Sequence, residues 1–331
     1  MIHGKYMDNF WQYQVVINLI IQNWGDWLAP VMRFLSSLGQ VEFYILVLPI
    51  LYWVFDAGLA VRFTFLLVLS GFSNAFLKIT FHAPRPYWLD TRVKAFANES
   101  SFGLPSGHAQ NAATLGGYIT TLVNSGKLKA LVFTLVFLIG FSRIYLGVHF
   151  LSDVVAGWVI GGFLLLLFIG LEKKVVAWFS PHAVIWKTVW IVILSLFIII
   201  LMVGWLSVQS MTPVPLNWVA NIKNLAGIIY TTPYSADDTI TFSGVFLGMM
   251  LGNMWLNQLM KYNPASGTLR QKLGRIFLGF LGLLAIVYGI NAIFPASSDF
   301  PGQILRFSRF GFASLWISFL APFLFKKWSL L

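Results

Sequence analysis

The chain has 331 residues, of which 58% are hydrophobic and only 10% charged, and its mean hydropathy is +0.78. This composition excludes an ordinary soluble domain, and the absence of cysteine excludes disulfides, iron–sulfur clusters and thiolate metal sites. The formal net charge of +11 does not indicate a nucleic-acid partner, because the basic residues lie between apolar runs and not along one soluble face.

The first 39 residues mix aromatic with polar side chains. Trp11, Trp24, Trp27 and Phe34 stand among polar neighbours. Aromatic residues in such surroundings are typical of the boundary between membrane and water. Residues 1–39 are therefore predicted to form one or two interfacial helices, with a further short span as the alternative.

Long apolar runs follow, and a helix needs about 20 mostly apolar residues to cross a bilayer. Runs bounded by Gly, Pro, Asn or charge predict nine spans, at 40–56, 59–80, 107–124, 128–146, 152–171, 185–206, 240–258, 275–294 and 307–326. The predicted fold class is all-α, a polytopic transmembrane helical bundle. The stretch 207–239 predicts a solvated connector in preference to a cover over a substrate entrance.

Alternate loops differ in charge. The loops after the first, third, fifth and seventh predicted spans lie on one side of the membrane together with the C-terminus. This side holds only two of the 11 acids, Asp56 and Glu172. It holds 12 of the 22 Lys and Arg, at positions 62, 127, 129, 173, 174, 187, 261, 270, 272, 275, 326 and 327. Basic loops tend to stay in the cytoplasm. The three polar clusters described next then face the periplasm, the exterior or an organelle lumen.

One cluster is Pro105-Ser106-Gly107-His108, which immediately precedes an apolar run and so opens a helix. Free backbone N–H groups at a helix start bind anions, the Ser106 hydroxyl lies there too, and Gly107 lets the chain approach a ligand closely. His108 is placed to protonate a leaving oxygen. Alone, the pattern is more typical of an ordinary helix cap.

A second cluster pairs His149 with Asp153, four residues later and on the same face of a helix. A carboxylate bonded to one ring nitrogen fixes the tautomer and leaves the other nitrogen free as a nucleophile. Arg143 ends the preceding span, and a turn at Gly147 can return it to His149. Ionisable groups at membrane depth are costly, which favours function over a pair that only satisfies itself.

The remaining cluster contains two cations, Lys78 at the end of a span and Arg85 after the helix-breaking Pro84. Both can converge on one anion, and phosphoryl transfer needs fixed positive groups of this kind. The alternative is a pair of cations that reach the interface from the ends of spans.

These residues form the pattern Lys78-x6-Arg85-Pro86, Pro105-Ser106-Gly107-His108 and Ser142-Arg143-x5-His149-x3-Asp153. The pattern resembles the signature of the type 2 phosphatidic acid phosphatase superfamily over residues 78–153, and residues 36–56 more weakly resemble its sphingosine-1-phosphate phosphatase branch. The resemblance implies that Lys78, Arg85 and Arg143 bind phosphate with help from Ser106 and Gly107. It further implies that His108 is the general acid, that His149 forms a phosphohistidine and that Asp153 orients it.

The resemblance also implies a core of six spans, here 40–206, that needs no metal or other cofactor. The rest of the chain would be the interfacial segment 1–39 and, at 207–331, a loop with three additional spans. These spans carry no readable motif. They are expected to pack against the core, and the alternatives are that they widen a lipid groove, support a homodimer or have a second role.

The predicted function is a metal-independent membrane phosphatase that hydrolyses a lipid phosphate or diphosphate, in the bacterial cytoplasmic membrane with its site facing the periplasm or exterior. A lipid phosphotransferase could use the same side chains. A transporter of anionic lipids or ions is an alternative from another class, since helix starts and basic residues also bind transported anions. A His–Asp pair is not needed for transport, and the choice among lipid phosphates stays open.

Overall fold

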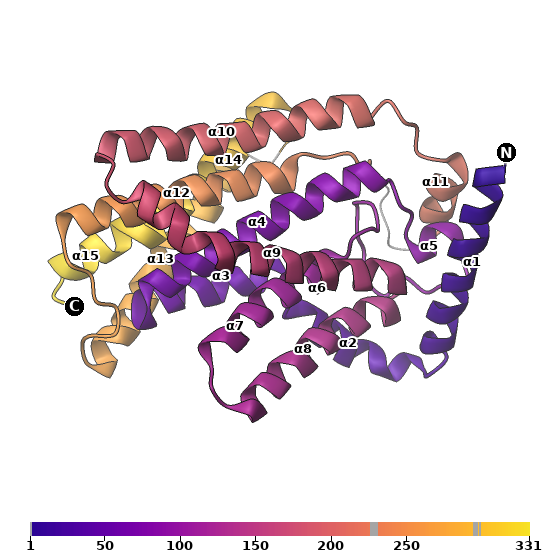
Figure 1. Ribbon diagram of the computed structural model, residues 1–331, viewed down its shortest axis with the longest axis horizontal. Helices are drawn as coiled ribbons and strands as arrows, with labels where there is room; N and C mark the ends of the chain where they lie inside the picture. The colour runs from indigo at the N-terminus through magenta and orange to yellow at the C-terminus, as the bar shows by residue number, and fades with distance from the viewer. Residues whose placement is uncertain (1, 226–230, 294–296, 298) are drawn as a thin grey trace. The chain divides into compact units, whose positions relative to one another are not determined.

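The computed structural model describes residues 2–225, 231–293, 297 and 299–331, and every regular element in these ranges is helical (Figure 1). Seven helical segments of the described chain are long and apolar enough to cross a membrane: Ala57–Leu89, Gly126–Tyr145, Leu151–Phe179, Val184–Gln209, Asp237–Leu259, Leu269–Ile293 and Phe300–Lys327. They comprise α4 with α5, α8, α9, α10, α12, α13, and α14 with α15. The predicted all-α membrane bundle is confirmed.

The other two predicted spans are helical but shorter. The first consists of α3 (Val41–Ile50) and a π-helical turn, Leu51–Phe55, with Pro49 inside the helix. The second consists of α6 (Gly107–Asn111), a π-helical turn at Ala112–Gly116, and α7 (Gly117–Leu122). Apolar composition revealed these segments, but it does not report where a helix widens or ends.

The chain forms two compact units that alternate along the sequence. Unit 1 comprises Met1–Gln40, Ser73–Leu167 and Trp205–Ser235, and unit 2 comprises Val41–Phe72, Phe168–Gly204 and Ala236–Leu331. The predicted segments 1–39, 40–206 and 207–331 follow chain order, whereas the units follow the packing of helix faces. Residues far apart in sequence therefore share one core.

The core of unit 1 is built on α1 (Ile2–Gln22), α2 (Ala29–Ser37), α5 (Pro86–Leu89) and the loops around them. Trp88 and Phe102 are buried there, so neither ring is exposed to contact lipid. Trp88 packs 6.0 Å from Trp218 of α11 (Leu216–Lys223), and Phe102 packs 5.2 Å from Tyr234, measured between ring centroids. The described part of 207–239 thus packs on the core and is more than a solvated connector.

Unit 2 is held by close helix contacts and buried polar bonds. The Trp53 indole donates to the carbonyl of Ile317 at 2.8 Å, and the Tyr52 hydroxyl donates to that of Ser318 at 2.9 Å. A Cβ added at Gly248 of α12 would lie 2.1 Å from the carbonyl oxygen of Gly311 in α14. Small residues at such crossings let membrane helices approach closely.

Candidate active site

The first two predicted cations are delivered by the end of α4 (Ala57–Phe81) and the turn after it. Lys78 lies in the last turn of α4, and Arg85 immediately precedes α5. Both side chains are buried, and Arg85 has no exposed surface. A guanidinium without contact to water needs protein acceptors, because burial of an unpaired charge is strongly unfavourable.

Backbone carbonyls supply most of these acceptors for Arg85. Its Nε donates to the Ser101 carbonyl at 2.6 Å, and its other nitrogens donate to the carbonyls of Val148 at 2.8 Å and Phe102 at 3.2 Å. The Ser101 hydroxyl accepts from Lys78 Nζ at 2.8 Å and from Arg85 at 3.1 Å. Ser101 thus joins the two cations, although no spacing in the sequence singles it out.

Ser106 stands at the N-terminal cap of α6, as its sequence context predicts. The Ser106 backbone N–H donates to the Asp153 carbonyl at 2.9 Å, which ties the start of α6 to the start of α9 (Leu151–Phe179). Gly107 faces Asn74, since an added Cβ would lie 3.0 Å from Asn74 Oδ1. The small size of Gly107 therefore serves packing against α4.

A tight turn joins Arg143, at the end of α8 (Gly126–Tyr145), to His149. Gly147 makes this turn with a φ of 74°, and a Cβ there would lie 2.4 Å from the carbonyl oxygen of Lys94. A residue with a side chain would suffer both the unfavourable φ and this contact. The turn brings Arg143 back beside His149, as the sequence predicts.

The His149 imidazole lies between a carboxylate and a guanidinium. Its Nδ1 is 3.2 Å from Asp153 Oδ2, which also accepts the Phe150 backbone N–H at 2.9 Å. Its Nε2 is 3.4 Å from an Arg85 nitrogen. Carboxylate on one side and donor on the other favour the tautomer with the proton on Nδ1, so the lone pair is on Nε2.

Burial and the neighbouring cations act on His149 in the same direction. Burial lowers the pKa of the imidazole well below its usual value, and the charges of Arg85, Lys78 and Arg143 lower it further. His149 is therefore neutral at neutral pH, which is the state that a nitrogen nucleophile requires.

Glu99, in the loop before Ser106, brings a carboxylate among the cations. It forms an ion pair with Arg143, and its other oxygen is 3.8 Å from Arg85. Burial alone would raise the pKa of Glu99, but Arg143 and Arg85 outweigh it and hold the pKa well below its usual range. An acid between two motifs rich in cations is the only sequence signal for this residue.

Four polar atoms of the predicted residues are buried and lack a hydrogen-bond partner in the described part of the chain. Three of them can donate, namely Ser106 Oγ, His108 Nε2 and Arg143 Nε, and the fourth is the acceptor Asp153 Oδ1. Buried polar atoms are normally satisfied, so the three donors indicate room for a ligand rich in oxygen. An oxyanion held by Lys78 and Arg85 would suit them.

Helix α2 supplies two further residues near this cluster, both missed by sequence reasoning. The Ser36 hydroxyl accepts a hydrogen bond from Arg143. Gly39, just after α2, lies against His108, where an added Cβ would be 3.2 Å from the imidazole. The amino-terminal segment therefore forms part of the wall of the site.

All eight predicted site residues belong to unit 1, and electrostatic contacts join His149 to His108, Arg85, Lys78 and Arg143. Within the described residues, no group of three or more His, Cys, Asp or Glu is arranged to hold a metal ion. The cations instead suit an anion with several oxygens, such as phosphate.

Comparison with known proteins identifies the family. The model of the PAP2 superfamily matches residues 59–177, which include all eight residues, and a model described as the transmembrane extension of PAP2 superfamily phosphatases matches residues 240–331. Phosphatidylglycerophosphatase B of Bacillus subtilis is 32% identical over 165 residues, which are 45% of this chain and 77% of that protein. The chain belongs to the PAP2 superfamily.

Two eukaryotic relatives are also similar to part of this chain. Lipid phosphate phosphatase delta of Arabidopsis thaliana is 34% identical over 155 residues, 42% of this chain and 37% of the relative. Sphingosine-1-phosphate phosphatase 2 of Mus musculus is 31% identical over 150 residues, 41% of this chain and 40% of the relative. The chain thus spans well under half the length of these two PAP2 proteins, and the predicted resemblance to this family is confirmed.

Proposed function

We propose that the protein is an integral-membrane phosphatase that hydrolyses a lipid phosphate or diphosphate through a covalent intermediate on His149. The observation that carries the proposal is the buried His149 imidazole, held by Asp153 at Nδ1 and facing Arg85 with Nε2. The names of the relatives, all phosphatases of lipid phosphates, support the substrate class.

In the first step, the lone pair of His149 Nε2 attacks phosphorus while the bond from phosphorus to the lipid oxygen breaks. Lys78, Arg85 and Arg143 hold the phosphate oxygens and stabilise the charge that they carry in the transition state. His108 in its protonated form gives its proton to the departing oxygen, so the lipid leaves as an alcohol. Burial and the charge of Arg143 lower the pKa of His108 well below its usual value in the free protein, so the negative charge of the bound phosphate is needed to keep it protonated. The Ser106 hydroxyl donates a hydrogen bond to a phosphate oxygen.

In the second step, water attacks the phosphohistidine. His108, neutral after the first step, takes a proton from the water, and the bond from phosphorus to Nε2 breaks. Inorganic phosphate leaves, and both histidines return to their starting states. All the positive charge in this scheme is carried by the protein, so the reaction needs no metal ion.

Orientation follows from the loop charges. We place the site on the side of the membrane opposite the basic loops, which in a bacterial cytoplasmic membrane is the periplasmic side. Because the chain has no cysteine, Asn98→Cys introduces a single site for labelling. Asn98 is exposed in the loop between α5 and α6, which also carries Glu99 and Ser101 of the site. A maleimide reagent that cannot cross the membrane should label it in intact cells, and labelling only after lysis would reverse the orientation. A homodimer stays a prediction of the sequence.

The central experiment measures phosphate released by purified protein from a panel of lipid phosphates and diphosphates in excess chelator. Wild type should turn over at least one of them, and His149→Ala should be folded but slower by about three orders of magnitude or more. His182→Ala is the matched control, because His182 lies in unit 2 and packs against Trp178. Wild type that moves lipid across vesicles but releases no phosphate would instead favour a transporter.

A further inference from the structure

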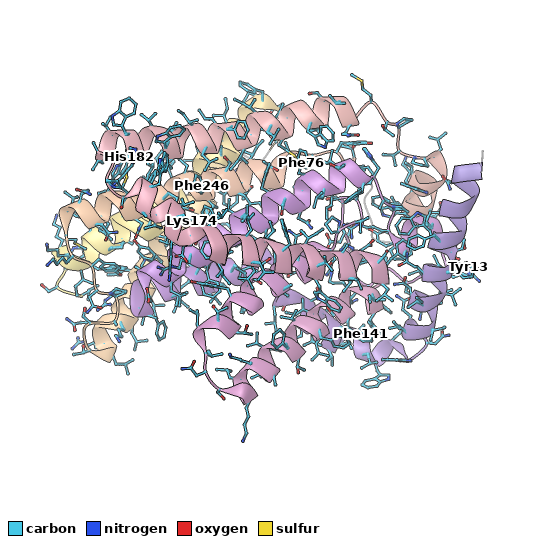
Figure 2. The ribbon with its side chains drawn as sticks, viewed as in Figure 1. Tyr13, Phe76, Phe141, Lys174, His182 and Phe246 are labelled. Atoms are coloured by element: carbon cyan, nitrogen blue, oxygen red, sulfur yellow. The ribbon has the colours of Figure 1, made fainter. Side chains whose placement is uncertain are left out.

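Helix α1 carries a row of buried amides. Gln14, Asn18 and Gln22 are spaced by four residues and so share one face of the helix, and they are only 6%, 0% and 7% exposed. Tyr13 is 76% exposed and projects from the outer side of α1 in Figure 2. Amides are rarely buried to this extent without a specific partner, because desolvation of an unpaired amide is unfavourable.

The partners are backbone groups of the segment 144–152, which carries His149. Asn18 Nδ2 donates to the carbonyl of Ile144 at 2.8 Å and to that of His149 itself at 3.1 Å. Gln22 Nε2 donates to the Tyr145 carbonyl at 2.9 Å. Gln14 Oε1 accepts the Ser152 N–H at 2.9 Å.

Gln22 also holds the preceding loop. Its Nε2 donates to the Lys94 carbonyl at 2.8 Å, and its Oε1 accepts the Lys94 N–H at 3.0 Å. Lys94 is the residue whose carbonyl lies against the turn at Gly147. One face of α1 therefore holds both segments that meet at this turn, the loop at Lys94 and the segment 144–152.

We propose that Asn18 is a positioning residue for His149 and that α1 is part of the catalytic apparatus. This inference rests on the proposed function. Asp153 sets the tautomer and rotation of the imidazole and also accepts the Phe150 N–H, one end of the peptide group between residues 149 and 150. Asn18 holds the other end of that peptide, the His149 carbonyl, and joins it to the carbonyl of Ile144, the neighbour of the phosphate-binding Arg143.

A nucleophile displaced by about 1 Å can lose about a hundredfold in rate, even when the substrate still binds. We therefore expect Asn18→Leu, which keeps the volume but loses both donors, to lower kcat about 10- to 100-fold. The KM for the lipid phosphate should change by less than about threefold, because Lys78 and Arg85 keep their anchors on Ser101 and Phe102, outside this segment. The rate of phosphoenzyme formation should fall as much as kcat.

Asn23→Leu is the matched control, since Asn23 follows α1 directly and is exposed. Asn18→Ala also removes both hydrogen bonds and introduces a smaller side chain, so it decides the question if the leucine variant does not fold. A kcat within twofold of wild type for a folded Asn18→Leu or Asn18→Ala would overturn the inference. Failure of the proposed function looks different, because wild type itself would then release no phosphate or would not depend on His149.

Discussion

The two ring nitrogens of His149 have neighbours of opposite charge, a carboxylate at Nδ1 and a guanidinium beside Nε2. Burial lowers its pKa well below the ordinary value for histidine, and Arg85, Lys78 and Arg143 lower it further. Because kcat/KM reports the ionisation of the free enzyme and of the free substrate, the second ionisation of the phosphate, at about pH 6, is measured separately and divided out. The remaining acidic limb should lie below the ordinary histidine value of about 6.5.

The same shift affects stability. The folded protein binds fewer protons at His149 than the unfolded chain once the pH falls below about 6.5. This group therefore lowers the free energy of unfolding on acidification and has no such effect above that pH.

The kcat/KM profile for a soluble short-chain lipid phosphate tests the lowered pKa of His149 directly. An acidic limb at or above the ordinary histidine value would mean that His149 is not held neutral as described.

Glu99 competes with phosphate for Arg143, because its carboxylate pairs with the same guanidinium. Glu99→Gln should therefore lower both the KM for substrate and the inhibition constant of inorganic phosphate, by about three- to tenfold, which corresponds to about 1 kcal/mol. Glu172→Gln is the control, since Glu172 pairs with Arg62 in unit 2. Weaker phosphate inhibition in Glu99→Gln would show that the carboxylate helps binding.

The sequence predicted the site residues whose spacing along the chain matches a helix face or a known motif. It did not predict the residues that hold the site through contacts with distant segments. His149 and Asp153 were visible because a spacing of four residues places them on one helix face. Ser101 and Asn18 were not, because their contacts depend on where a loop passes, and no periodicity encodes that path. Ser36 and Glu99 were missed for the same reason, since each contacts Arg143 from a segment distant in sequence.

Helix α9 holds the start of α6 by direct backbone contact. A Cβ at Gly157 would lie 2.6 Å from the Ser106 carbonyl oxygen, whereas a Cβ at Gly162 would meet nothing within 4 Å. The close contact leaves no room for a methyl group, so the two helices would have to separate.

Gly157→Ala should therefore displace Ser106 and lower kcat by about tenfold or more. It should also destabilise the protein by about 1–3 kcal/mol. Gly162→Ala should change neither property for the worse, because alanine favours the helix. Activity and thermal unfolding in detergent check both variants, and equal behaviour of the two would refute the proposed contact.

The irregular helices show a feature that amino-acid composition does not predict, namely where a helix departs from regular α-helical geometry. Apolar residues at 107–124 indicated a span, and a helix is found over 107–122, but the π-helical turn at Ala112–Gly116 has no signature in composition. Pro49 similarly stands inside α3, where a missing N–H loosens the helix. Helix existence follows from hydropathy, whereas helix regularity follows from packing.

Arg275 shows how unit 2 is held together at one end. It has no exposed surface, and its nitrogens donate to the carbonyls of Leu330, Trp53, Pro264 and Ser266. Among the described residues no carboxylate forms an ion pair with Arg275, and these four carbonyls accept the hydrogen bonds of its guanidinium. Arg275 is thus a structural cation that joins segments distant in sequence.

Arg275→Leu leaves these carbonyls unsatisfied, at about 1–3 kcal/mol each where water does not reach them. The melting temperature in detergent should fall by about 5 °C or more. Arg270→Leu on the same helix, α13, is the control, because Arg270 is exposed. An unchanged melting temperature in Arg275→Leu would contradict the structural role.

Across the whole chain, loop charge and hydropathy predicted a polytopic bundle, but chain order did not predict which helices share a core. Residues 41–72 and 236–331 belong to unit 2, while 1–40 belongs to unit 1 with the site. The polar row on α1 explains part of this, because amides at 14, 18 and 22 bind backbone that lies more than a hundred residues later. Such contacts need a structure to be seen.

The central claim is that His149 carries the phosphoryl group between the two steps. Wild-type protein is mixed rapidly with a lipid phosphate that it hydrolyses and is quenched in alkali, where a bond from phosphorus to nitrogen survives, and the modified residue is located by peptide mass spectrometry. The account predicts phosphate on His149, formed before free phosphate appears and absent in His149→Ala. Phosphate on Ser106, or turnover with no phosphorylated residue at all, would contradict it.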